Sequence, residues 1–148
     1  MEKIRSFIKA LSGENIEQVH KIIKENSQWF GETDEKSFIH SNFYGLYSED
    51  NKLIGFFAVS DWQYGTEKVI CFLYIFEDYR EKGLFNKIIK YVKKTFTECS
   101  YITIGATLEN KIANEIYNRK FRFITYSEED RGNWYLVLER GYYGKEKL

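Results

Sequence analysis

Apolar residues recur every three or four positions in three segments of the chain, and this spacing predicts amphipathic helices. The clearest helix is expected from Leu84 to Phe96, because one apolar stripe follows its length while most of its lysines fall on the other faces. Further helices are expected over about 13–26, after a capping Ser12, and over about 110–119. One face of the last helix is expected to carry Ile112, Ala113, Ile116 and Tyr117.

Apolar runs bounded by glycine or polar clusters predict the strands. The run from Val69 to Phe76 is apolar at every position, which is typical of a central strand covered on both faces. Runs on either side of the polar turn 48–51 predict an antiparallel hairpin. The expected strands are 4–11, 43–47, 52–62, 67–76, 101–107, 121–126 and 134–139.

The order of these elements predicts an α/β fold of the α+β kind. Its sheet is expected to be mixed and mostly antiparallel, with about seven strands and about four helices on the two faces. The fourth helix is expected to start at Thr33, because a hydroxyl followed by two acids suits a helix N-terminus, and to run to about Ser41. The unit 67–107 is expected to be a right-handed parallel crossover. We expect one domain over residues 1–140 and a charged tail over 141–148.

Charge, hydropathy and cysteine usage argue against several classes of protein. The 148-residue chain carries 22 basic and 22 acidic residues, whereas a nucleic-acid-binding protein usually has surplus positive charge that neutralises phosphates. No apolar run approaches the roughly 18 residues of a membrane span. We therefore expect a cytoplasmic protein that binds neither nucleic acid nor membrane. Cys71 and Cys99 lack metal-ligand spacing and nothing pairs His20 with His40, so no metal is expected.

The strongest chemical signal is the segment Arg-Glu-Lys-Gly-Leu-Phe at 80–85, between the buried strand and the clearest helix. The first turn of a helix has N–H groups without partners and the positive end of the helix dipole. Glycine there lets the backbone approach a ligand, and Arg80, Lys82 and Lys87 add positive charge. The segment therefore fits a phosphate or pyrophosphate, although a plain turn with solvated basic residues has the same composition.

This segment, with the strand before it, resembles the acetyl-CoA-binding motif of the GNAT acetyltransferases, Gln/Arg-x-x-Gly-x-Gly/Ala. Arg80 and Gly83 match the first two fixed positions, whereas Phe85 stands where the family usually has glycine or alanine. The stretch from Asn110 to Tyr117 resembles the family's Asn-x-x-Ala-x-x-Leu-Tyr helix, without the glycine that follows it in many members. The order of elements over nearly the whole chain also fits the family.

The resemblance implies that two central parallel strands splay apart and hold acetyl-CoA between them. Tyr117 is implied as the acid that protonates the departing thiolate, and the alternative is a tyrosine of the core. Asn110 is implied as the asparagine that bonds the cofactor or the strand near it, and the alternative is a simple helix cap. The residues implied in binding the cofactor are Leu73, Tyr74, Ile75, Arg80, Glu81, Lys82, Gly83, Leu84, Phe85, Asn110 and Ala113.

The catalytic base and the acceptor site are implied by position only. Some members of the family have a glutamate base on the strand before the glycine motif, and the matching position here is about Val69, which cannot act as a base. Glu67, on the same face of the strand, is the nearest candidate. A water chain and an acceptor that arrives unprotonated are the alternatives. The two loops that commonly frame the acceptor in the family point here to Trp29, Phe30, Glu128 and Glu129, whose acids would attract a cationic amine.

The expected function is N-acetyl transfer from acetyl-CoA to a primary amine of a small molecule or peptide, by direct attack and without a metal. The high aromatic content and the frequent dimerisation of family members favour a homodimer. Two alternatives stay open: a non-catalytic acyl-CoA sensor, and an interaction module for protein or nucleic acid. The interaction module would use the lysine-rich face of the 84–96 helix.

Overall fold

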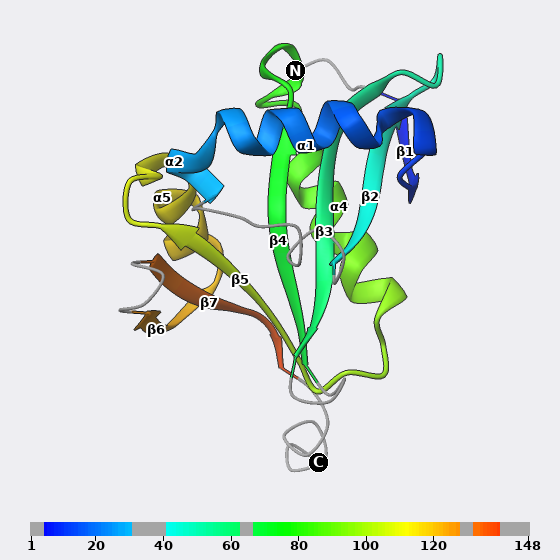
Figure 1. Ribbon diagram of the computed structural model, residues 1–148. Coiled ribbons are helices and arrows are strands. Elements are labelled where there is room, and N and C mark those ends of the chain that lie inside the picture. Colours follow the sequence, from blue (N-terminus) through cyan, green and yellow to red (C-terminus); the bar gives the residue numbers. More distant parts are fainter. Residues whose placement is uncertain (1–4, 31–40, 63–66, 128–131, 140–148) are drawn as a thin grey trace.

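A seven-stranded sheet crosses the molecule in the computed structural model, which describes residues 5–30, 41–62, 67–127 and 132–139 (Figure 1). The strands lie in the order β1-β2-β3-β4-β5-β7-β6. All neighbours are antiparallel except β4 and β5, which are parallel. This mixed sheet confirms the expected fold class. The strands are β1 Ser6–Ala10, β2 Ser41–Ser48, β3 Leu53–Trp62, β4 Glu67–Ile75, β5 Tyr101–Thr107, β6 Arg122–Ser127 and β7 Gly132–Glu139.

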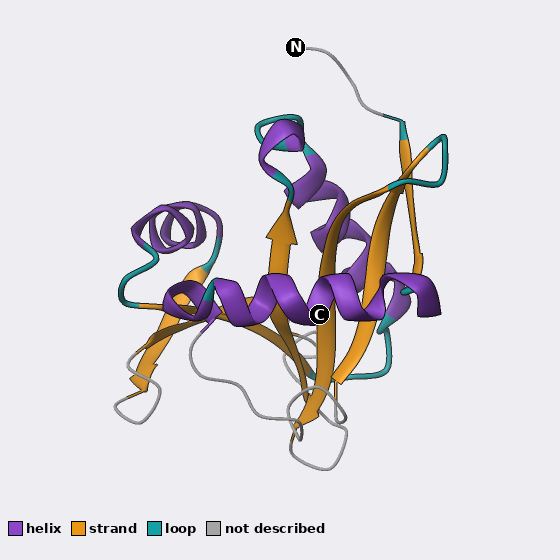
Figure 2. Cartoon of the chain, turned by 45° about the horizontal axis from the view of Figure 1, so that its top comes forward, coloured by secondary structure: helices purple, strands orange, loops and turns teal. Residues whose placement is uncertain are grey.

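Helices cover both faces of the sheet. Within the described ranges the longer helices are α1 Ile16–Glu25, α4 Leu84–Thr95 and α5 Lys111–Lys120, and the single turn α2 Ser27–Phe30 follows α1. Helix α1 crosses one face and α4 lies on the other (Figures 1 and 2). None of these helices is long and apolar enough to cross a membrane. The helix expected from Thr33 and the tail over 141–148 lie outside the described residues.

Each face of the sheet has its own apolar core. On one face, α1 buries Val19 and Ile23 against β2 and β3. On the other face, the apolar stripe of α4 and part of α5 pack on the central strands. The largest fully buried side chains of this second core include Leu46, Phe57, Ile70, Ile88, Ile102, Ile104 and Tyr135. Burying each such side chain stabilises the fold by about 1.5–3 kcal/mol, so these stripes decide which face each helix covers.

Strand β4 contains a β-bulge in the middle of its length. Two of its residues, Phe72 and Leu73, oppose the single residue Phe57 of β3. Phe72 has a φ of 54°, in the left-handed region that side chains rarely allow. The extra residue shifts the alternation, so Phe72 and Tyr74 pack beneath α1, whereas Ile70 and Leu73 pack beneath α4.

Ser12 and Ile112 do not have the roles expected from the sequence. Ser12 precedes the first helical turn, but its side chain makes no capping bond. Its backbone N–H donates instead to the Tyr47 hydroxyl at 3.0 Å. Ile112 is 75% exposed, because α5 meets the sheet through Ala113 and Tyr117. Neighbouring residues of a helix point about 100° apart, so Ile112 faces solvent.

Candidate functional site

The parallel strands β4 and β5 pair over a short stretch and then separate. Their last pair is Ile70 with Ile104. Beyond it, β4 follows β3 as far as Ile75, and β5 follows β7 as far as Thr107. Figure 1 shows the two strands diverging toward the ends that lead into α4 and α5. A ligand with amide groups of its own can bond strand edges that face such an opening.

The first turn of α4 lies at the open end of this splay. Gly83 is the N-cap residue with a φ of 80°, and Glu81 has a φ of 60°. A Cβ at position 83 would meet no atom within 4 Å, so backbone conformation, not crowding, requires glycine. No side chain caps the helix. The N–H groups of its first turn and its dipole therefore form a place for an anion.

Arg80 fastens the loop between β4 and α4. Its Nε donates to the Ile75 carbonyl at 2.7 Å, and its guanidinium carbon lies 5.2 Å from the centre of the Tyr74 ring. Both contacts tie the loop back onto the last residues of β4. Arg80 thereby helps to hold Gly83 at the mouth of the splay, and its terminal N–H groups remain able to bond an anion.

Tyr117 and Phe85 stack on each other between α5 and α4. Their ring centroids are 5.7 Å apart and the planes differ by 21°. Tyr117 is 6% exposed and lies edge-on against Tyr135. Burial, with a smaller contribution from Tyr135, raises the pKa of Tyr117 well above that of a free phenol. The hydroxyl therefore stays protonated at neutral pH. No hydrogen bond joins this hydroxyl to another described residue.

Asn110 joins the open end of β5 to α5. Its backbone N–H donates to the Thr107 carbonyl at 3.1 Å. Its side chain accepts from the Ala113 N–H at 3.1 Å, so Asn110 is the cap that the sequence suggested. This tight turn sets the direction in which α5 leaves β5 and carries Tyr117 back along the sheet.

Asn114 connects three elements one turn before Tyr117. Its Nδ2 donates to the Thr107 carbonyl of β5 at 2.8 Å. Its Oδ1 accepts from the Tyr135 hydroxyl at 2.7 Å and from Nδ2 of Asn133 at 3.0 Å, both in β7. The helix that carries Tyr117 is therefore fixed to β5 and β7 by polar contacts as well as by packing.

Aromatic rings line the opening on the α1 face. The Phe30 ring, at the end of α2, lies 6.0 Å from that of Phe72 and 6.1 Å from that of Tyr74. Across the opening, the Trp134 ring of β7 covers Gly105 of β5, where a Cβ would come within 2.8 Å of it. Both sides of the splay therefore present aromatic surface on this face.

The structure brings the predicted cofactor residues together and separates Glu67 from them. Leu73, Tyr74 and Ile75 form the β4 edge, 80–85 forms the mouth, and Asn110 and Ala113 begin α5. Glu67 starts β4 and lies three residues, or about 10 Å, before the last β4–β5 pair. It is therefore on the closed side of the splay, where the two strands are still paired. By strand alternation it lies on the α1 face, whereas Tyr117 packs on the other.

Burial raises the pKa of Glu67, but its distance from the opening keeps it apart from the other site residues. Of the residues expected to bind the acceptor, Phe30 lies in the aromatic surface. The Trp29 side chain, Glu128 and Glu129 lie outside the described residues. In the described part of the chain, no cluster of three or more histidine, cysteine, aspartate or glutamate side chains could hold a metal.

Three features of the site had no motif in the sequence: the bulge at Phe72, the ring of Trp134 over Gly105, and the hydrogen bonds of Asn114. Only Asn114 left a signal, because asparagine is disfavoured inside helices unless its side chain has partners. The bulge contains no glycine, and the pairing of Trp134 with Gly105 depends on the register between β5 and β7.

The chain belongs to the GNAT acetyltransferases: the sequence profile of the Acetyltransferase (GNAT) family matches residues 9–123. The matched range contains both motifs and both strands of the splay. No curated protein matches the chain in sequence.

Solved structures share the fold. An acetyltransferase from Thermus thermophilus has a TM-score of 0.72 at 12% identity, over 92% of this chain and 98% of that one. A GNAT acetyltransferase from Staphylococcus aureus has a TM-score of 0.70 at 15% identity, over 90% and 99%. N-acetylglutamate synthase from Neisseria gonorrhoeae, complexed with coenzyme A and N-acetyl-glutamate, has a TM-score of 0.70 at 15% identity, over 91% and 35%.

Proposed function

We propose that this protein transfers an acetyl group from acetyl-CoA to a primary amine, which attacks the thioester directly. The observation that carries the proposal is the opening between β4 and β5, which leads to the uncapped first turn of α4. Coenzyme A has amide groups along its pantetheine arm and a pyrophosphate at one end. The strand edges suit the amides, and the helix N-terminus suits the pyrophosphate.

Family membership supports the use of acetyl-CoA, and so does the complex of the Neisseria gonorrhoeae enzyme with coenzyme A, because 35% of that enzyme's chain matches this fold. In our proposal the backbone N–H groups of 83–85 bind the pyrophosphate, with Arg80 and Lys82 beside them. The edge formed by Leu73, Tyr74 and Ile75 aligns the pantetheine arm. A backbone N–H on that edge polarises the thioester oxygen, which is worth about 3 kcal/mol in the transition state.

In the chemical step, the amine nitrogen forms a bond to the carbonyl carbon, and the carbon–sulfur bond then breaks. Tyr117 donates its proton to the departing thiolate. Its raised pKa keeps the phenol protonated until the thiolate forms but also makes it a weaker acid. The same apolar surroundings disfavour a bare thiolate, and this is what drives the proton to sulfur. Because Glu67 lies on the closed side of the strand pair, we expect the attacking nitrogen to lose its proton to water and water to return a proton to the Tyr117 phenolate.

The acceptor amine enters from the α1 face in this proposal. Phe30, Phe72 and Trp134 supply apolar contact there, and a protonated or neutral amine can lie against their ring faces. Trp29, Glu128 and Glu129 stay proposed acceptor contacts, whose two acids would attract a cationic substrate.

The test is calorimetric titration of the purified protein with acetyl-CoA, comparing the wild type with Gly83→Glu. The variant adds a negative charge at the anion site and a side chain at a φ of 80°, and we expect at least about a hundredfold weaker binding. Gly13→Glu is the matched control, because position 13 also has no atom near its Cβ and lies before α1. A folded wild type that binds no acetyl-CoA would contradict the proposal.

A second candidate is a non-catalytic acyl-CoA sensor. Val69 stands where some GNAT members have a glutamate, and the Phe85 ring fills the space beside Tyr117. Release of free thiol from acetyl-CoA, measured across a panel of amines, distinguishes the acetyltransferase from the sensor. Binding without any amine-dependent thiol release favours the sensor.

A further inference from the structure

A basic groove runs between α4 and the edge strand β1. It encloses about 600 Å³ and is lined by Ile8 of β1 and by Lys87, Lys90, Tyr91, Lys93 and Lys94 of α4. No acidic residue is among these lining residues, although the whole chain has equal numbers of acidic and basic residues. The charged residues that line the groove are therefore all basic.

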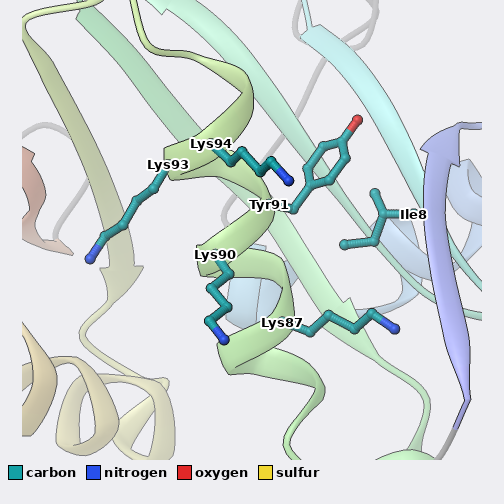
Figure 3. A pocket seen from close by; sticks show the side chains of 6 residues that line it. All are labelled: Ile8, Lys87, Lys90, Tyr91, Lys93 and Lys94. Atoms are coloured by element: carbon teal, nitrogen blue, oxygen red, sulfur yellow. The ribbon is translucent and has the colours of Figure 1, made fainter.

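Two of the four lysines flank an apolar floor (Figure 3). Lys87 and Lys94 reach from α4 toward β1, with Tyr91 and Ile8 between them, whereas Lys93 points to the other side of the helix. Lys87 is held in place, since its Nζ donates to the Ser6 carbonyl and, at 2.9 Å, to the Ser6 hydroxyl.

Lys90 and Lys94 are exposed, and neither forms an ion pair with a described carboxylate. Like charges held close together repel one another, and an anionic partner relieves that repulsion. Lysine is a compact point charge without the planar fork of arginine, so it suits carboxylates that arrive from several directions.

Strand β1 forms the other wall and is the first strand of the sheet. Among the described strands it pairs only with β2. An edge strand can accept an extended peptide as an added strand. Side chains on one face of such a peptide are about 6.7 Å apart. Lys87, Lys90 and Lys94 are about 4.5 and about 6 Å apart along α4, so carboxylates at alternate peptide positions would lie beside them.

We propose that this groove binds an extended acidic peptide segment of a partner protein, which adds to β1 and places alternate carboxylates against the lysines of α4. The groove shares α4 with the proposed pyrophosphate site, but its other wall, β1, is separated from the splayed strands by β2 and β3. Peptide binding there does not require acetyl transfer.

The make-up of the groove favours a peptide over a nucleic acid. Single-stranded nucleic acids bind where aromatic faces are free to stack on bases. Among the described lining residues Tyr91 is the one aromatic, and its ring lies edge-on against Tyr44 and Phe57, at 5.8 and 6.2 Å. No arginine that could bond base edges is present in the part of the lining that the structure describes.

The test uses fluorescence anisotropy with a short labelled peptide that alternates glutamate and threonine. We expect the full-length protein to bind it saturably, and Lys90→Glu with Lys94→Glu to weaken binding by at least about tenfold. The matched control is Lys21→Glu with Lys24→Glu, which changes the charge equally at exposed positions of α1. The milder pair Lys90→Gln with Lys94→Gln replaces the glutamate pair if that one does not fold.

Hydrogen exchange supplies the second readout. The bound peptide is expected to slow exchange of backbone amides in residues 6–10, and acetyl-CoA binding is expected to stay the same in every lysine variant. Four results would overturn the proposal: no saturable binding by the wild type, equal losses in the two charge-reversed pairs, unchanged exchange in β1, or tighter binding of an oligothymidine than of the peptide.

Discussion

The two parts of the sheet, β1–β4 and β5–β7, are stabilised in different ways. The strand pairs within each part are antiparallel, but in β1–β4 both faces carry fully buried side chains such as Phe56 and Phe57. In β5–β7, the outer strand β6 leaves Phe123, Ile124 and Tyr126 between 43% and 49% exposed, and Asn114 joins the strands to α5 by hydrogen bonds. The splay lies at the boundary, so the larger part, β1–β4 (the apolar half), carries the anion site, while the smaller part, β5–β7 with α5 (the polar half), carries Tyr117.

The largest effect on stability is expected from the apolar half. Phe56→Ala removes a side chain with no exposed surface and is expected to lower the free energy of unfolding by about 3–5 kcal/mol, because a cavity remains. Urea denaturation measures this. Phe7→Ala is the control at a position that is 41% exposed, and a similar loss there would mean that burial does not explain the difference.

Tyr117→Phe tests whether the polar half supplies the acid. We expect kcat to fall by about a hundredfold or more, because the thiolate loses its proton donor while the stacking ring remains. Acetyl-CoA affinity and the midpoint of thermal unfolding are expected to change little. Steady-state kinetics on the amine that gives turnover provides the measurement, and unchanged kcat over the whole pH range would remove this role from Tyr117.

Asn114→Ala tests whether hydrogen bonds hold the polar half together. The change leaves the buried Tyr135 hydroxyl without the acceptor it now has, and we expect a loss of about 2 kcal/mol in the free energy of unfolding. Asn118→Ala, at an exposed position of the same helix, is the control. Equal stability of the two variants would show that packing alone positions α5.

The smallest expected effect is a pH dependence at the alkaline end. Burial raises the pKa of Tyr117, so the folded state holds this proton more tightly than the unfolded state, where the pKa is about 10. The resulting stabilisation is complete below about pH 10 and is lost as the pH rises further. Tyr117→Phe should therefore lose stability less steeply above about pH 10. Some slope should remain, since burial also raises the pKa values of Tyr44 and Tyr135. Urea denaturation of the wild type and Tyr117→Phe at a series of pH values measures the free energy of unfolding of each. Identical slopes against pH would mean that Tyr117 does not contribute.

Local patterns in the sequence were enough to predict most elements and one end of the site. The stripe of α4, the hairpin of β2 and β3 and the junction at Gly83 each depend on residues close together in the chain. Hydrophobic period, helix caps and glycine conformation act over a few residues, so they can be recognised without the fold. The resemblance of 80–85 and 110–117 to the family motifs added the prediction that the two central parallel strands separate and hold a cofactor between them.

Other features depend on residues that are distant in the chain, and only the tertiary structure decided them. The bulge at Phe72 reverses the faces of the strand beyond it, and the register of β4 with β5 leaves Glu67 on the closed side of the splay. Asn114 finds its partners in β5 and β7, and the lysines of α4 gain a neighbour in β1. Strand register and long-range packing arise from the whole arrangement of the sheet, which no short segment of sequence contains.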